Sequence, residues 1–249
     1  MKGIGTEFME RTRYEALAPS DQARGAPQPP LELALPPDAL GRVDLPAPNA
    51  PGLGSIALRD AIGVRRSLRE YSEEPLSLAE LSFLLWATQG VRETVPGKLT
   101  LRTVPSAGAR HPFETLLLVN RIQRLPCGLY RFLAIPHQLA PLPAPGDVAD
   151  RAAAAALGQE MVKESAATFI WIAVPERTTW RYGERGYRYL HLDAGHVAQN
   201  LYLAAESVGA GACAIAAFSD DEMNALLGLD GERQFAIYLA AVGKRPRPA

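Results

Sequence analysis

The chain has 249 residues, of which 47% are hydrophobic, and a formal net charge of −1. This length and composition favour one large folded domain over two small ones. A nearly neutral chain has no general attraction for nucleic acid or for an anionic membrane surface. The two cysteines, Cys127 and Cys213, lie far apart, so neither a disulfide framework nor a metal-binding CxxC pair is expected.

The sequence shows no sign of export or membrane insertion. Its first residues lack a basic run followed by an apolar core, which a signal peptide requires. No stretch approaches the roughly 18 uninterrupted apolar residues of a membrane-spanning helix. We therefore expect a soluble, cytoplasmic protein without a membrane partner.

Residues 1–50 differ in composition from the rest of the chain, because many of its prolines gather there: Pro19, Pro27, Pro29, Pro30, Pro36, Pro37, Pro46 and Pro48. Such a composition favours extended chain over packed helices. We expect either a disordered leader or an arm laid on a partner subunit. The folded domain is then expected over residues 51–249.

The first half of this domain mixes helical and strand-like segments. A short helix is expected over 55–64 and a second over 77–90, where Ser77 and Glu80 stand at capping-box spacing. Leucines on one stripe of the second helix should face the core, namely Leu78, Leu81, Leu84 and Leu85. Apolar runs rich in β-branched or aromatic residues predict strands over 99–106 and 113–120 and a hairpin over 128–142.

The second half continues the mixture. Helices are expected over 147–164 and 189–209 and from Ser219, which forms a second capping box with Glu222. The helix over 189–209 has one side of small residues, Ala194, Gly195 and Ala198, which would let another helix approach closely. Strands are expected over 167–175, 212–218 and 234–243. Mixed helices and strands without an internal repeat predict an α+β fold.

Two familiar kinds of site can be set aside. Residues 52–57 and 209–214 both read Gly-x-Gly-x-x-Ala, but neither follows a strand and opens a helix as a dinucleotide-binding turn must. His191 and His196 would point roughly 140° apart on a helix that turns about 100° per residue. They cannot converge with Asp193 on one metal ion, so no metal site is predicted.

Two short segments suggest chemistry. The first, VRRSLREY, puts Arg65, Arg66, Ser67 and Arg69 within five residues. It is either a solvated basic helix end or a phosphate site, because a phosphate binds guanidinium and hydroxyl donors. The second, VPSAGARHPFE over 104–114, is either a plain connecting loop or a loop whose small residues let the backbone approach a phosphate or a planar ring.

These segments, in this order, resemble the nitroreductase family, and most closely its SagB-type dehydrogenase branch, which includes azoline oxidases of peptide natural-product pathways. The resemblance covers roughly residues 56–245. Besides the two segments above it rests on CGLYRF, on WRYGERGYRYLHLDAGHVAQNLYLAAESVGAGACAIAAFSDDEMNALLGLDG and on YLAAVGKRP. It implies a mainly antiparallel central sheet flanked by helices, a homodimer, and bound FMN.

The resemblance also implies which residues hold FMN. Arg65 and Ser67 would hold the phosphate and ribityl chain, with Arg66 in the same motif, and Arg69 would approach N1 and O2 of the ring. The remaining positions are a loop that contacts FMN from the partner subunit (Pro105, Ser106, Ala107, Gly108), a strand against the ring (Ala214, Ile215, Ala216) and a late basic pair at the phosphate (Lys244, Arg245).

One departure bears on catalysis. SagB-type azoline dehydrogenases carry a Lys-Tyr pair before a glycine, where this chain has Arg181 and Tyr182 before Gly183. A buried lysine can lose its proton, whereas an arginine in effect cannot. Tyr182 remains a candidate acid or base, and Arg181 is either at the catalytic site or a surface cation.

Three functions are compatible with these residues. The first is an FMN-dependent reductase or dehydrogenase of small organic molecules, with NADPH, NADH or the organic substrate as reductant. The second is a SagB-type dehydrogenase that oxidises azoline rings of a peptide within a multi-enzyme complex. The third is a flavin-binding protein without turnover.

Overall fold

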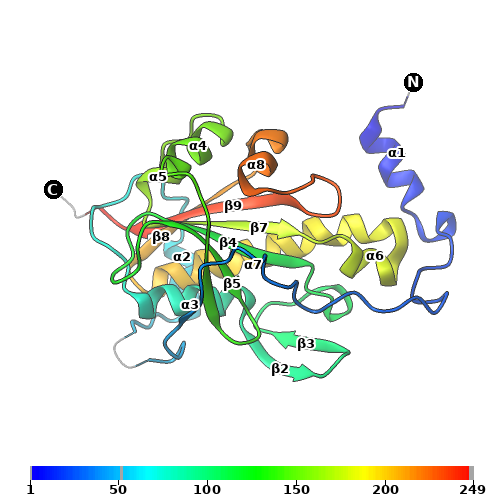
Figure 1. Ribbon diagram of the computed structural model, residues 1–249, viewed down its shortest axis with the longest axis horizontal. Helices are drawn as coiled ribbons and strands as arrows, with labels where there is room; N and C mark the ends of the chain where they lie inside the picture. The colour runs from blue at the N-terminus through cyan, green and yellow to red at the C-terminus, as the bar shows by residue number, and fades with distance from the viewer. Residues whose placement is uncertain (1, 51–52, 247–249) are drawn as a thin grey trace.

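The central feature of the computed structural model, which describes residues 2–50 and 53–246, is a seven-stranded sheet (Figure 1). All its strand pairs are antiparallel. In spatial order the strands are β1 (Val43–Asp44), β6 (Gln138–Leu142), β5 (Gly128–Leu133), β4 (Phe113–Val119), β7 (Ala167–Ala173), β9 (Phe235–Lys244) and β8 (Ala210–Ile215). The predicted α+β fold with an antiparallel sheet is confirmed, although residues 51, 52 and 247–249 of the predicted domain lie outside the described residues.

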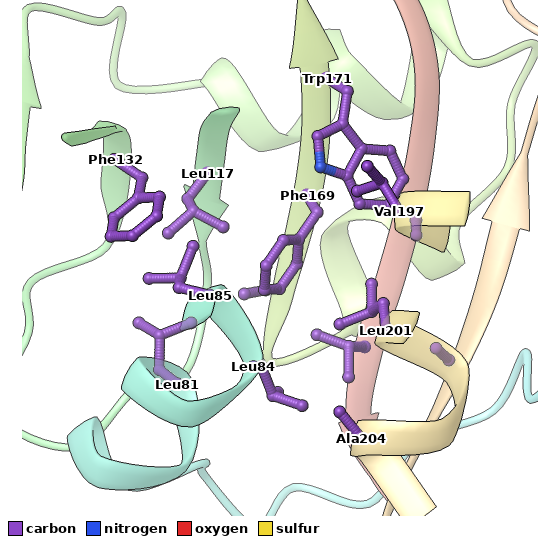
Figure 2. Packing of buried hydrophobic residues seen from close by; sticks show 14 of the residues in the cluster. Leu81, Leu84, Leu85, Leu117, Phe132, Phe169, Trp171, Val197, Leu201 and Ala204 are labelled. Carbon is purple, nitrogen blue, oxygen red and sulfur yellow. The ribbon is translucent and has the colours of Figure 1, made fainter. Parts of the chain in front are cut away.

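One face of the sheet is covered by α3 (Leu78–Gln89) and α7 (Gly186–Ser207), with α2 (Leu58–Val64) beside α7. Leu81, Leu84 and Leu85 of α3 are fully buried, as their spacing predicts. Figure 2 shows them pointing toward Leu117 and the aromatic rings of the sheet, while Val197, Leu201 and Ala204 of α7 complete the layer. This layer forms the larger of two hydrophobic cores.

The opposite face carries α4 (Val148–Ala155), α5 (Met161–Glu164) and α8 (Asp220–Leu227) over a second core (Figure 1). The single helix expected over 147–164 is wrong, because the chain turns between α4 and α5. Leu157 has φ 58° and Gly158 has φ 77°, a left-handed conformation that ends α4.

Local capping signals predict the starts of α3 and α8 correctly. The Ser77 hydroxyl accepts from the Glu80 amide, and the Glu80 carboxylate accepts from the Ser77 amide. On α7, Ala194 and Ala198 are buried in the core, whereas Gly195 faces outward. The helix that approaches α7 is α3, whose Ala87 carbonyl accepts from Asn200 Nδ2 at 2.8 Å.

Several elements were not predicted. They are α1 (Ile4–Arg11), β2 (Val91–Val95), α6 (Glu176–Tyr182), and three short 3-10 turns, η1 (Tyr14–Ala16), η2 (Ala107–Ala109) and η3 (Gly183–Arg185). The strand that pairs with β2 is β3 (Leu99–Arg102), which lies within the strand predicted over 99–106. The expectation of extended chain before residue 50 is therefore wrong for α1. This helix precedes the first proline, Pro19, and an ion pair between Glu7 and Arg11 spans one of its turns.

The leader runs along the body of the protein. The Gln22 amide donates to the Trp180 carbonyl at 2.8 Å, and Trp180 Nε1 donates to the Ala26 carbonyl at 2.9 Å. Farther on, Arg177 Nε donates to the Pro30 carbonyl at 2.9 Å, and β1 adds to the sheet beside β6. Within the described residues, no helix has both the length and the apolar character to cross a membrane.

Candidate functional site

The arginine-rich segment leaves the end of α2 and runs beside β8. Ser67 forms a parallel bridge with Ala212, and the Leu68 amide donates to the Ala212 carbonyl at 2.9 Å. A methyl group on Gly211 would lie 2.6 Å from Leu68 Cδ2, so only glycine allows this close approach. The segment is thus fixed along the edge of the main sheet.

Tyr202 of α7 joins several residues of the predicted FMN motif. Its hydroxyl lies 3.0 Å from Ser67 Oγ and accepts from the Ala214 amide at 2.8 Å. The Arg65 guanidinium lies over its ring, 5.3 Å from the centroid. The hydrogen bond between the two hydroxyls uses only one of their two hydrogens. Sequence analysis missed Tyr202, which looks like an ordinary aromatic of the 189–209 helix.

The cations of this edge differ in their partners. Arg65 is half-buried, Arg66 and Arg69 are exposed, and no carboxylate of the described residues forms an ion pair with any of the three. In contrast, Lys244 Nζ lies 2.6 Å from Glu80 Oε1, and Arg245 Nη2 lies 2.5 Å from Glu206 Oε2. The early arginines are therefore free to bind an anion. The late basic pair is already neutralised, so its assignment to the phosphate stays a prediction.

The loop expected to reach the cofactor is anchored by Asp193 of α7. The Asp193 carboxylate accepts from Ser106 Oγ at 2.6 Å and from the Ala107 amide at 3.2 Å. Ser106 Oγ in turn accepts from the His111 amide at 2.9 Å. Burial raises the pKa of Asp193, and these hydrogen bonds partly offset the rise. Asp193 thus holds the loop from inside, a role that its position in the sequence does not reveal.

The two histidines of α7 have different contacts. His196 Nδ1 lies 3.9 Å from Asp193 Oδ1, while His191 is hydrogen-bonded to the Tyr187 carbonyl and is exposed. Residues 2–50 and 53–246 hold no cluster of His, Cys, Asp and Glu suited to a metal ion. The absence of a metal site stays a prediction.

Arg181 and Tyr182 end α6 directly beside this loop. A methyl group on Gly108, where φ is 58°, would lie 2.5 Å from the Tyr182 hydroxyl and 3.0 Å from Arg181 Cδ. The Arg181 guanidinium lies 5.7 Å from the centre of the Tyr182 ring. The structure therefore brings both candidate catalytic residues to the loop of residues 105–108. Arg181 is exposed, which also agrees with the alternative that it is only a surface cation.

Only part of the strand predicted to lie against the flavin ring, residues 214–216, faces the side where Tyr202 lies. Ala214 is half-buried beside Tyr202, and Ala216 is exposed just beyond the end of β8. The Ile215 side chain is buried in the second core with Met223, because side chains alternate along a strand. Ile215 can therefore meet a ligand on the Tyr202 side only through its backbone.

The arginine segment and the loop lie on opposite sides of α7. Tyr202 contacts the first and Asp193 contacts the second. These positions are nine residues apart, which corresponds to about 14 Å along the helix axis and a rotation of about 180°. Within one chain, α7 therefore separates the two groups of residues that were predicted to bind FMN.

Comparison with known proteins identifies the family. Residues 62–244 match the Nitroreductase family. The chain belongs to this family. A candidate nitroreductase of Methanocaldococcus jannaschii is 37% identical over 195 residues, which make up 78% of this chain and 94% of that protein.

Nitroreductase-family structures share the fold. A candidate nitroreductase from Ralstonia eutropha has a TM-score of 0.68 at 26% identity and covers 89% of this chain and 100% of its own. One from Anabaena variabilis has a TM-score of 0.64 at 31% identity, and this chain spans only 38% of its length. A more distant one, from Desulfovibrio desulfuricans, was solved in complex with FMN, with a TM-score of 0.53 at 20% identity over 78% of this chain and 93% of that one.

A further relative matches about half of this chain. The trifolitoxin-processing protein TfxB of Rhizobium leguminosarum is 31% identical over 133 residues, which make up 52% of this chain and 36% of that protein.

The donors at the β8 edge suit the FMN that nitroreductase-family proteins use. Three guanidinium groups without carboxylate partners and one hydroxyl match the needs of a phosphate with nearly two negative charges.

Proposed function

We propose that this protein is an FMN-dependent oxidoreductase that acts, as a homodimer, on a small organic substrate. The observation that carries the proposal is the division of the site into two half-sites on opposite sides of α7. One half-site has the unpaired Arg65 and Arg69, and the other has the loop at Gly108 with Tyr182. A second copy of the chain can supply the half-site that each cofactor lacks.

Exposed apolar side chains support the dimer. Leu58 and Ile62 of α2 are 66% and 58% exposed, and Leu192 of α7 is 59% exposed. Gly195 is exposed on the same helix as Leu192. Leu58 and Ile62 lie one turn apart on α2, which packs against α7, and exposed apolar side chains on one helix face favour burial by a partner. The leader, which lies along the body of its own chain, remains a candidate arm toward that partner.

Each residue has a defined task in this proposal. Arg65 and Ser67 would hold the FMN phosphate and ribityl chain, and Arg69 would place a fixed positive charge near N1 and O2. Bound FMN supplies two-electron redox chemistry. The Tyr182 hydroxyl, which makes no hydrogen bond within the described residues, is placed to give a proton to a substrate or to take one.

The experiment is a visible spectrum followed by reduction. Purified protein should be yellow, should release FMN on denaturation, and should be bleached by NADH or NADPH, with reoxidation by a quinone or a nitroaromatic. Well-folded protein that stays colourless in excess FMN would refute the cofactor. Protein that holds FMN but is bleached by no nicotinamide would instead be a flavin-binding protein or a dehydrogenase that takes its electrons from the substrate.

Similarity to the trifolitoxin-processing protein favours a second candidate, oxidation of azoline rings in a peptide. That reaction needs a base that removes a proton from carbon, and the guanidinium group of an arginine holds its proton too firmly to act as one. We therefore expect little azole formation by the wild-type protein. Azole formation from a thiazoline peptide by wild-type protein, unchanged in Arg181→Lys, would favour the peptide substrate over a small molecule.

A further inference from the structure

Arg110 and Arg181 approach Gly108 from two sides. Arg110 Nε donates to the Gly108 carbonyl at 3.1 Å, and its Nη2 donates to the Lys98 carbonyl at 3.0 Å. On the other side, a methyl group on Gly108 would lie 3.0 Å from Arg181 Cδ and 3.1 Å from Arg181 Nε. Two guanidinium groups therefore flank one turn of the loop, and Gly108 has no side chain to separate them.

Neither cation has a counter-charge. In the part of the chain that the structure describes, no carboxylate forms an ion pair with Arg110 or Arg181. Their guanidinium groups lie instead near aromatic rings, Arg110 at 5.4 Å from the Trp180 centroid and Arg181 at 5.7 Å from that of Tyr182. Burial, and after it the charge of Arg181, lowers the pKa of Arg110. An anion bound here would relieve this repulsion.

The surroundings of Arg181 suit a ligand better than a structural role. It is exposed, it donates no hydrogen bond to any described residue, and it stands beside the free Tyr182 hydroxyl. Other arginines of this region are held by the protein: Arg185 and Arg188 both donate to Thr12. Arg181 therefore keeps all its donors for something outside the chain.

We infer that Arg181, supported by Arg110, binds an oxyanion of the substrate at the mouth of the flavin site, so that anionic substrates are preferred over neutral ones. This inference rests on the proposed function. A guanidinium group pairs with a carboxylate or phosphate through two parallel hydrogen bonds, and the Tyr182 hydroxyl can add a third. Arg181 is then a specificity-determining residue, which explains why a base is not needed at its position.

Two sources could bring this anion: a carboxylate on the electron acceptor, or the pyrophosphate of a nicotinamide dinucleotide. Matched pairs of compounds distinguish them. The acceptor pair is 4-nitrobenzoate and 4-nitrobenzamide, which differ mainly in charge. The donor pair is NADH and 1-benzyl-1,4-dihydronicotinamide, which lacks the pyrophosphate.

In Arg181→Gln, kcat/KM for the anionic member of one pair should fall by roughly tenfold to a hundredfold, the range for hydrogen bonds to a charged group, while the neutral member changes less than about twofold. A loss with 4-nitrobenzoate assigns the site to the acceptor, and a loss with NADH assigns it to the donor. Arg181→Lys keeps the charge but not the paired geometry. Its kcat/KM for the anionic compound should therefore lie between those of the wild type and Arg181→Gln. Arg151→Gln, an equal change of charge on the exposed side of α4, should leave both ratios unchanged.

Calorimetric titration gives a readout without turnover. Wild-type FMN-loaded protein should bind benzoate more tightly than benzamide, and Arg181→Gln should remove the difference. The inference would be overturned if Arg181→Gln had the same anionic-to-neutral ratios as the wild type in both pairs and the same affinity for benzoate. Flavin reduction by the neutral donor would then still support the proposed function. Absence of flavin reduction by either donor would count against the proposed function instead, and the benzoate titration would still decide the role of Arg181.

Discussion

The arginines of this protein stand in two contrasting regions. Beneath the leader, Arg131 and Arg177 are buried, and both donate to the Glu114 carboxylate. Their remaining donors reach carbonyl groups of the leader: Arg177 bonds to Pro30, and Arg131 bonds to Leu33 and Ala34. Burial favours the neutral form of Glu114, but the two arginines outweigh it and hold the pKa of its carboxyl below the usual value.

The second region comprises the arginines at the two half-sites. Arg65, Arg66, Arg69 and Arg181 have no ion pair with any carboxylate of residues 2–50 and 53–246, and three of them are exposed. The comparison teaches that an arginine's role follows from what satisfies its donors. Where a carboxylate and backbone carbonyls surround it, it holds the fold, and where it faces solvent unpaired, it is available to a ligand.

The largest effect should come from breaking the buried group. Glu114→Gln leaves two buried guanidinium groups without their carboxylate, and loss of one partner of a buried ion pair costs about 3–5 kcal/mol. The free energy of unfolding, measured by urea denaturation, should fall by about that amount. Glu176→Gln, on the exposed start of α6, is the control and should change it little. A loss below about 1 kcal/mol in Glu114→Gln would remove the distinction between the two regions.

A change among the unpaired arginines should affect binding instead of stability. Arg65→Ala removes a donor to the FMN phosphate, and hydrogen bonds to charged groups contribute about 1.5–3 kcal/mol. The FMN dissociation constant, from a fluorescence titration, should rise roughly tenfold to a hundredfold, with the unfolding of the cofactor-free protein unchanged. Arg59→Ala, at a 95% exposed side chain of α2, is the matched control. An unchanged constant in Arg65→Ala would mean that Arg65 is only a solvated helix-end residue.

The buried region should also make stability depend on pH through His111. Burial, and after it the charge of Arg102, lowers the pKa of His111 to about 3, with Arg110 and Arg177 adding to the effect and a hydrogen bond with the Thr100 backbone opposing it. An unfolded histidine has a pKa of about 6.5. Between these values the unfolded chain binds a proton that the folded chain does not, so stability falls as pH drops from about 6.5 toward 3.

His111→Gln tests this sign, because glutamine does not titrate. Urea unfolding at about pH 7 and pH 5 should show a smaller loss of stability on acidification in the variant than in the wild type. Burial also lowers the pKa of His137, but that contribution is present in both proteins and cancels in the comparison. An identical pH dependence in the two proteins would show that His111 is not kept neutral by the fold.

The smallest effect is expected for the loop of residues 105–108, which Asp193 anchors. Asp193→Asn replaces a charged acceptor by a neutral one, at a cost of about 0.5–1.5 kcal/mol. Because the carboxylate holds Ser106 and the Ala107 amide, hydrogen exchange of the Ala107 and His111 amides should become roughly two- to tenfold faster. His191→Asn, on the exposed side of the same helix, should leave both exchange rates unchanged. Unaltered exchange in Asp193→Asn would mean that the loop is ordered by other contacts.

What the sequence could predict follows from how local each signal is. The Ser77–Glu80 capping box spans four residues, and the apolar runs of β4 and β7 bury every side chain, so both could be predicted. The roles of Asp193 and Tyr202 were not, because their partners Ser106 and Ser67 lie 87 and 135 residues away. The segment of α6 was missed because ERTTWRY shows no repeating apolar face.

The same limit, that only local signals can be predicted, applies to the two half-sites. The arginine segment, the small-residue loop and the Arg181–Tyr182 pair could each be found as short patterns, but not their placement on opposite sides of α7. The pairing of Lys244 with Glu80 was also out of reach, since 164 residues separate them and only the sheet brings them together. Short patterns identify donors, whereas the fold decides which of them remain free.

The most direct test of the divided site is subunit complementation. One subunit carries Arg65→Ala with Arg69→Ala, and the other carries Gly108→Val, whose side chain would clash with the Tyr182 hydroxyl. Each homodimer should bind FMN poorly. A heterodimer isolated with two affinity tags should recover one tightly bound FMN per dimer, because one of its two sites combines an intact arginine segment with an intact loop from the other chain. A heterodimer that binds no more FMN than either parent would contradict the account, since both half-sites would then have to belong to the same chain.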